Sequence, residues 1–127
     1  MTRLTVFDPH APAPVGPYSH AASTPGGPLH LSGQTPIDPA TGALVEGDVE
    51  TQTRRVFANL ESVLAASGRS FDDVVKVNVY LVDMADFAAM NDVYASVFDA
   101  PHPARTTVAV AGLPLGARVE IELVASR

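Results

Sequence analysis

Apolar residues recur along this chain at two spacings, and each spacing predicts one type of secondary structure. Between residues 49 and 64 they follow a helical spacing on one stripe, with Asp48 as the N-cap and Gly68 as the stop. Between Val74 and Asp83 they alternate with polar residues, which is typical of a strand with one buried face. The alternation predicts a buried set, Val75, Val77, Val79 and Leu81, and an opposite set, Lys76, Asn78 and Tyr80.

The other segments complete the predicted order of strands and helices. The turn letters PGG separate two short runs, YSHAAST and PLHLSGQ, and predict a hairpin. A second helix begins near Asp83 or Asp86, and Asn91 lies inside its apolar stripe, where an amide needs a hydrogen-bond partner. Two strands follow, over residues 104–111 and 118–125. The order β-β-β-α-β-α-β-β predicts an α+β fold with two helices on one face of a mixed sheet.

Two helices leave the second face of such a sheet uncovered. That face carries Lys76, Asn78 and Tyr80 among apolar residues, and period two places Glu120 and Glu122 together on one face of the last strand. A mixed polar and apolar face on a small domain favours an interface between copies of the chain. A solvated sheet face is the alternative that this pattern leaves open.

Composition narrows the classes of function. The 127 residues fit a single domain, residues 1–127, and the absence of cysteine excludes a disulfide framework, a thiolate nucleophile and a cysteine-based metal site. The net charge is −6 and the basic residues are scattered, which disfavours nucleic acid as a partner. No apolar run has the length of a signal peptide core or a membrane span, so we expect no membrane association and a cytoplasmic protein.

Few residues suggest chemistry by their spacing. The histidines lack metal-ligand spacing, the serines lack a nucleophile elbow, and no phosphate-binding glycine motif occurs. Arg105 precedes the run TTVAVA, which is typical of a strand packed on both faces, so its charge needs an anionic partner. That partner is either Glu120 or Glu122 on a neighbouring strand or the carboxylate of a ligand. A partly buried Glu120 would have a raised pKa and exchange protons near neutral pH, whereas a solvated one would not.

Several separated motifs together resemble the Rid (YjgF) family. They are APVGPYSHA, LSGQTPIDPATGALVEGDVETQTRRVFANLESVLAASG, DVVKVNVYLVDMADFAAMNDVYASVF and PARTTVAVAGLPLGARVEIELVA, and they cover residues 11–125. The resemblance implies a chorismate-mutase-like α+β fold and a homotrimer whose sheets form a barrel-like assembly with sites between adjacent subunits. It also implies cofactor-free hydrolysis of reactive enamines and imines, such as 2-aminoacrylate and 2-iminopropionate, to 2-keto acids and ammonia.

The same resemblance assigns roles to individual residues. Arg105 matches the arginine that grips the substrate carboxylate, and Glu120 matches the glutamate that handles the attacking water and its proton. The substrate-binding positions that it implies are Tyr18, Ser32, Gly33, Asn91, Arg105 and Thr107. No metal is implied. Thr107 stands where many members have cysteine, and Ala109 replaces a glutamate that is common in them.

Those two departures keep alternative functions open. One is a sensor that binds 2-keto acids without turnover, and another is a pathway-specific deaminase of a larger imine. An endoribonuclease is disfavoured because the chain is acidic and has no pair of histidines suited to RNA cleavage.

Overall fold

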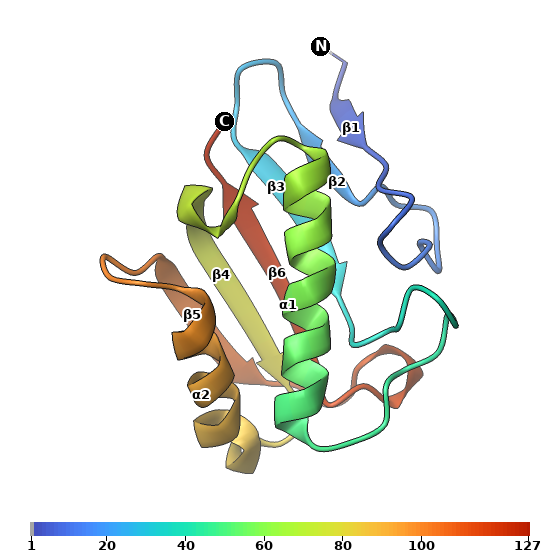
Figure 1. Cartoon of the computed structure of the whole chain (residues 1–127), viewed down its shortest axis with the longest axis vertical. Coiled ribbons are helices and arrows are strands. Elements are labelled where there is room, and N and C mark those ends of the chain that lie inside the picture. Colours follow the sequence, from blue (N-terminus) through green and yellow to red (C-terminus); the bar gives the residue numbers. More distant parts are fainter. Residues whose placement is uncertain (1) are drawn as a thin grey trace.

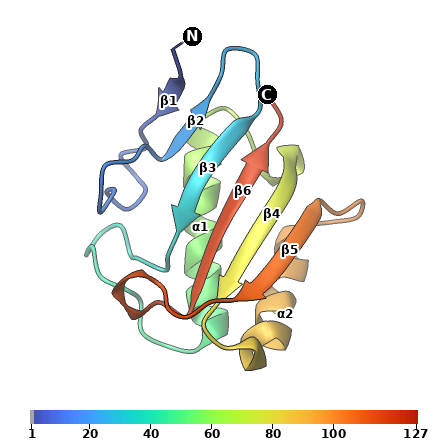
Figure 2. The same cartoon turned by 180° about the vertical axis from the view of Figure 1, so that it is seen from behind.

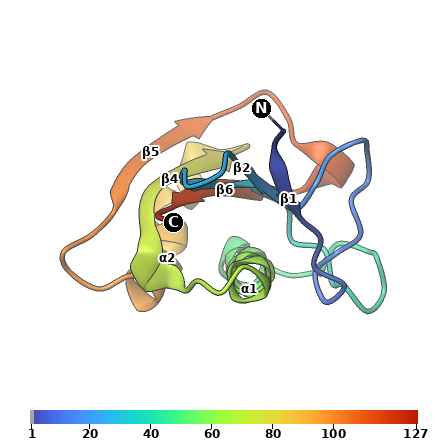
Figure 3. The ribbon, with the colours of Figure 1, turned by 90° about the horizontal axis from the view of Figure 1, so that it is seen from above.

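Six strands form one mixed sheet, and two helices cover one of its faces (Figure 1). The computed structural model describes residues 2–127. The elements in chain order are β1 (Leu4–Val6), β2 (Ala21–Ser23), β3 (Leu29–Gln34), α1 (Val49–Ala66), β4 (Val74–Leu81), α2 (Phe87–Val97), β5 (Ala104–Ala109) and β6 (Val119–Ala125). This order and the single helical layer confirm the predicted α+β architecture, and the layer is seen from above in Figure 3.

The sheet has the order β1-β2-β3-β6-β4-β5, so the last strand of the chain lies between β3 and β4. All neighbours are antiparallel except β4 and β5, which are parallel and are connected through α2. Register places Tyr80 opposite Glu120 and Asn78 opposite Glu122, whereas Val77 pairs with Arg105. Figure 2 shows the sheet from the side that no helix covers.

The core lies between the sheet and the helices. It is built from alternate residues of β4 and β6 and from the stripe of α1, and its fully buried members include Val77, Val79, Leu81, Val119, Ile121, Val56, Leu60 and Leu64. Burying an aliphatic side chain of this size contributes roughly 1.5–3 kcal/mol. Phe57 of α1 meets Tyr94 of α2 and Phe98 edge-on, which joins the two helices.

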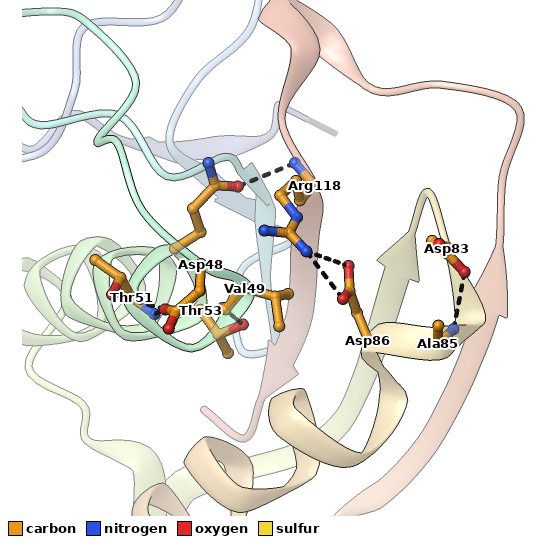
Figure 4. A network of polar contacts seen from close by, with 9 residues as sticks. Asp48, Val49, Thr51, Thr53, Asp83, Ala85, Asp86 and Arg118 are labelled. Carbon is orange, nitrogen blue, oxygen red and sulfur yellow. Dashed lines mark hydrogen bonds and ion pairs between the residues drawn. The ribbon is translucent and has the colours of Figure 1, made fainter.

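Local sequence signals set the two ends of α1 as predicted. The Asp48 carboxylate accepts a hydrogen bond from the Thr51 N–H and caps α1, and Gly68 has a φ of 71° just beyond its end. In Figure 4, Arg118, which precedes β6, binds Asp86 at 3.0 Å, and its backbone N–H donates to the side chain of Gln52. These contacts attach both helices to the start of β6. Neither helix is long and apolar enough to cross a membrane, as far as residues 2–127 show.

Two predictions about the strands were wrong. Val75 is 50% exposed, because the register between β4 and β6 shifts between Val74 and Lys76 and Val74 takes the buried position. The run after Arg105 is not packed on both faces in the protomer: β5 is an edge strand, and Val108 is 40% exposed. The prediction failed because small and β-branched residues, such as those of this run, also occur in edge strands.

Candidate functional site

Arg105 of β5 points toward the helical layer, on the same side of the sheet as its register partner Val77. Its Nη1 donates a hydrogen bond to Asn91 Oδ1 at 2.7 Å. Its guanidinium carbon lies 4.6 Å from the ring centroid of Tyr94 and 5.6 Å from that of Phe87. Helix α2 therefore contacts the guanidinium through an amide and two aromatic rings. Arg105 is the hydrogen-bond partner that Asn91 needs inside the apolar stripe of α2.

An ion pair between Arg105 and Glu120 or Glu122 is not found. Among residues 2–127 no carboxylate oxygen lies within 4 Å of the Arg105 guanidinium, because β5 adjoins β4 and not β6. The guanidinium faces an open hollow of about 380 Å³. This hollow is lined by Asn91, Tyr94, Ala95, His102, Pro103 and Arg105. A guanidinium carries five N–H donors, so one that is anchored by a single amide retains donors for a ligand carboxylate.

Thr107 follows Arg105 on the same side of β5. Its Oγ1 is buried and has no hydrogen-bond partner among the described residues, and the same is true of Tyr94 Oη. Burial also raises the pKa of Tyr94, with a smaller opposing effect from Arg105, so the phenol stays neutral. The hydroxyl groups of Thr107 and Tyr94, which have no hydrogen-bond partner among the described residues, thus belong to residues that neighbour Arg105.

Glu120 lies on the other side of the sheet. We call this side the open face and define it by Lys76, Asn78 and Tyr80 of β4 and by Glu120 and Glu122 of β6. Partial burial raises the pKa of Glu120, and the charge of Glu122 raises it further. Gly33 of β3 leaves room for this carboxyl group, because a Cβ there would lie 2.5 Å from Glu120 Oε2.

Glu122 has donors that Glu120 lacks. Tyr80 Oη donates to Glu122 Oε1 in a short hydrogen bond, and Asn78 Nδ2 donates to the same oxygen at 3.2 Å. The Glu122 carboxylate and burial raise the pKa of Tyr80 to about 12. Period two predicts that these residues share one face, but it indicates no role for Tyr80 or Asn78. Only the register between β4 and β6 reveals the contact.

Tyr18 and Ser32 line a second hollow, of about 400 Å³. Ser32 Oγ donates to the carbonyl oxygen of Ser19 at 2.6 Å, and Tyr18 Oη accepts from the Val15 N–H at 3.2 Å. The lining also includes Arg3 and His30, which sequence reasoning did not connect with Tyr18 because they are distant in the chain. Tyr18 is 44% exposed, so its ring is accessible to a ligand.

The predicted site residues thus form three groups within one chain, one of which is Tyr18 and Ser32 at the second hollow. Arg105, Asn91 and Thr107 adjoin the helical layer, whereas Glu120 lies on the open face with Gly33 beside its carboxyl group. Within residues 2–127 no group of three metal-ligating side chains occurs. The buried His20 has a structural role, since its Nδ1 accepts from the Asp8 N–H and its Nε2 contacts the Pro12 carbonyl oxygen.

Comparison with known proteins identifies the family. The model of the family described as Endoribonuclease L-PSP matches residues 8–127. A RutC family protein from Pyrococcus horikoshii is 50% identical over 94% of each chain. A 2-iminobutanoate/2-iminopropanoate deaminase from Dermatophagoides farinae is 45% identical over 92% of this chain and 91% of its own.

The fold agrees with this comparison. The crystal structure of RidA from an Antarctic Psychrobacter superposes with a TM-score of 0.93 at 43% identity, over 98% of this chain and 99% of that one. Both the sequence and the arrangement of helices on the sheet therefore lead to one conclusion: the chain belongs to the Rid (YjgF) family, whose model is described as Endoribonuclease L-PSP.

Proposed function

We propose that this protein is a cofactor-free deaminase of reactive imino acids of the 2-iminopropionate type, which it hydrolyses to 2-keto acids and ammonia. The observation that carries the proposal is the state of Arg105, which is anchored by Asn91 and Tyr94 but has no carboxylate partner among residues 2–127. A held guanidinium with donors to spare suits a ligand carboxylate. The deaminase name of the Dermatophagoides farinae relative supports the same substrate class.

The reaction requires a positioned substrate, one water molecule and a group that moves protons. Glu120 gives its proton to the imine nitrogen, and the C=N carbon becomes electrophilic. Water attacks that carbon, the C–O bond forms, the π electrons pass to nitrogen, and Glu120 takes a proton from the water. Glu120 then protonates the nitrogen of the carbinolamine, the C–N bond breaks, and ammonia leaves while the hydroxyl proton returns to Glu120. Imine and water thus give ketone and ammonia without a covalent enzyme intermediate.

The site of this reaction is assembled from two copies of the chain. Arg105 and Glu120 belong to opposite sides of one sheet, so a cleft that contains both needs Arg105 from one protomer and Glu120 from another. The open face and the β5 edge supply surface for such contacts, and Val108 of β5 is 40% exposed. We infer a homotrimer with sites between subunits, and we place it in the cytoplasm.

A coupled assay tests the proposed function. A threonine or serine dehydratase generates the imino acid, and formation of the keto acid is followed with and without this protein. Acceleration by the wild type that is lost in Arg105→Ala supports the proposal. Arg54→Ala is the matched control, because Arg54 is exposed on α1 and should leave turnover unchanged.

Two results would overturn the proposed deaminase. Equal acceleration by the wild type and Arg105→Ala removes Arg105 from the site. Calorimetric binding of pyruvate or 2-ketobutyrate without turnover of small or large imino acids supports a ligand sensor instead. Turnover of large imino acids alone favours the pathway-specific alternative, for which the open hollow of about 380 Å³ leaves room.

A further inference from the structure

We propose that Glu122 is a positioning residue for Glu120: Tyr80 and Asn78 hold the Glu122 side chain beside Glu120, so that Glu120 is the carboxyl group that exchanges the proton. The inference rests on the proposed function, in which Glu120 moves protons to and from the imine. It assigns a role to three residues of the open face that have none in that mechanism.

Two hydrogen bonds hold the Glu122 carboxylate in place. Tyr80 and Asn78 both donate to Glu122 Oε1, one from a phenol and one from an amide. Two donors on one oxygen fix the position of this side chain beside Glu120. The Tyr80 phenol is a lasting donor, because it remains protonated far above neutral pH.

The geometry around Glu120 favours its neutral form. Among residues 2–127, no side chain or backbone N–H donates a hydrogen bond to its carboxyl group. Glu120 Oε2 lies against the backbone of Gly33, and a Cβ at that glycine would be 2.5 Å from this oxygen. The backbone therefore takes the place of part of the water that would otherwise solvate the carboxyl group. Partial burial and the adjacent negative charge of Glu122 act in the same direction on Glu120.

Within one protomer, no cation lies beside Glu120. Lys76 of β4 lies in register with Val124, and its Nζ donates to Thr106 Oγ1 at 2.8 Å. His30 of β3 also lies in register with Val124, four residues along β6 from Glu120. Arg118, which precedes β6, is committed to Asp86 on the helical side. Within one protomer, the titratable groups beside Glu120 are Tyr80, directly opposite, and Glu122. In the proposed site Arg105 of another copy also faces Glu120, and it is present in the wild type and in every variant described below.

The register between β4 and β6 determines which glutamate receives the Tyr80 hydrogen bond. Tyr80 sits opposite Glu120, yet its hydroxyl group reaches diagonally to Glu122 and leaves Glu120 without a donor. A phenylalanine at position 80 would fill the same space without the hydroxyl group. The Tyr80→Phe variant therefore separates the electrostatic role from packing.

Carbon-detected NMR titration of the glutamate side chains in the intact protein tests this inference. In Glu122→Gln we expect the Glu120 titration to shift to lower pH, because the neighbouring charge is gone. In Tyr80→Phe we expect a smaller shift in the same direction, because Tyr80 no longer holds Glu122 beside Glu120. Glu61→Gln, an exposed change on α1, leaves the Glu120 titration in place.

The pH profile of kcat/KM for imine hydrolysis gives the second readout. The inflection that follows the Glu120 titration should shift to lower pH in Glu122→Gln, whereas a purely structural role would lower activity at all pH values. An unmoved Glu120 titration in both Glu122→Gln and Tyr80→Phe overturns the inference, even if the wild type is a deaminase. If the Glu120 titration shifts as expected but no imino acid is hydrolysed, the effect of Glu122 on Glu120 stands and the proposed function falls.

Discussion

The Arg105 guanidinium and the Glu120 carboxyl group lie on opposite sides of the same sheet. Val77, the register partner of Arg105, points into the core under the helices, whereas Tyr80, the register partner of Glu120, points to the open face. Strand β4 separates the two strands that carry them. Within a single protomer, Arg105 and Glu120 therefore cannot contact the same substrate. This separation is the basis of the proposed site between copies of the chain.

Replacing Arg105 by lysine tests whether the shape of the guanidinium matters as well as its charge. Lysine keeps the charge but loses the planar fork that reaches Asn91 and a ligand carboxylate together. A charge-assisted hydrogen bond is worth about 1.5–3 kcal/mol, so we expect kcat/KM to fall roughly ten- to hundredfold. Steady-state kinetics with an unchanged circular dichroism spectrum check this. Full activity in Arg105→Lys would show that a point charge suffices.

Adding one methyl group at Gly33 tests the position of the Glu120 carboxyl group. The new Cβ would lie 2.5 Å from Glu120 Oε2, and the flexible glutamate side chain would move aside. We expect Gly33→Ala to lose most deaminase activity with little change in the melting temperature. Gly112→Ala is the control, because a Cβ at that position meets nothing within 4 Å. Equal activity in the two variants would contradict the importance of the Glu120 position.

The cap of α1 predicts a pH-dependent contribution to stability. Hydrogen bonds from the Thr51 N–H and hydroxyl group lower the pKa of Asp48. Its stabilising effect is therefore present above the ordinary aspartate pKa and is lost as the pH falls through the lowered value. We expect Asp48→Ala to melt at a lower temperature than the wild type near neutral pH, with the difference closing in strong acid. Asp48→Asn, which keeps a side-chain acceptor, should be close to the wild type at neutral pH, and a constant Asp48→Ala deficit at every pH would refute this cause.

Local periodicity was sufficient to predict the element order. The stripe of α1, its cap at Asp48 and the alternation of β4 from Val77 to Leu81 each repeat a short-range rule, and each is confirmed. Asn91 was marked by its place in an apolar stripe, and the structure supplies its partner, Arg105. Polar residues at positions that a period assigns to the core are thus the most informative signals in this sequence.

The rest depends on strand order and register, which local patterns do not contain. Placing β6 between β3 and β4 is what keeps Arg105 away from Glu120 and Glu122, and no spacing along the chain indicates it. The shift at Val74 that exposes Val75 is likewise a property of paired strands. The diagonal reach of Tyr80 to Glu122 needs both the register and the side-chain direction.

The most direct test of a site shared between copies is complementation between two inactive variants. Arg105→Ala and Glu120→Gln are mixed by co-refolding, mixed oligomers are verified by native mass spectrometry, and imine hydrolysis is measured. If each site takes Arg105 from one copy and Glu120 from another, random mixing restores roughly a quarter of the sites, and activity returns from two inactive parents. Verified mixed oligomers that stay inactive, beside an active wild type treated in the same way, would show that both residues act within one chain.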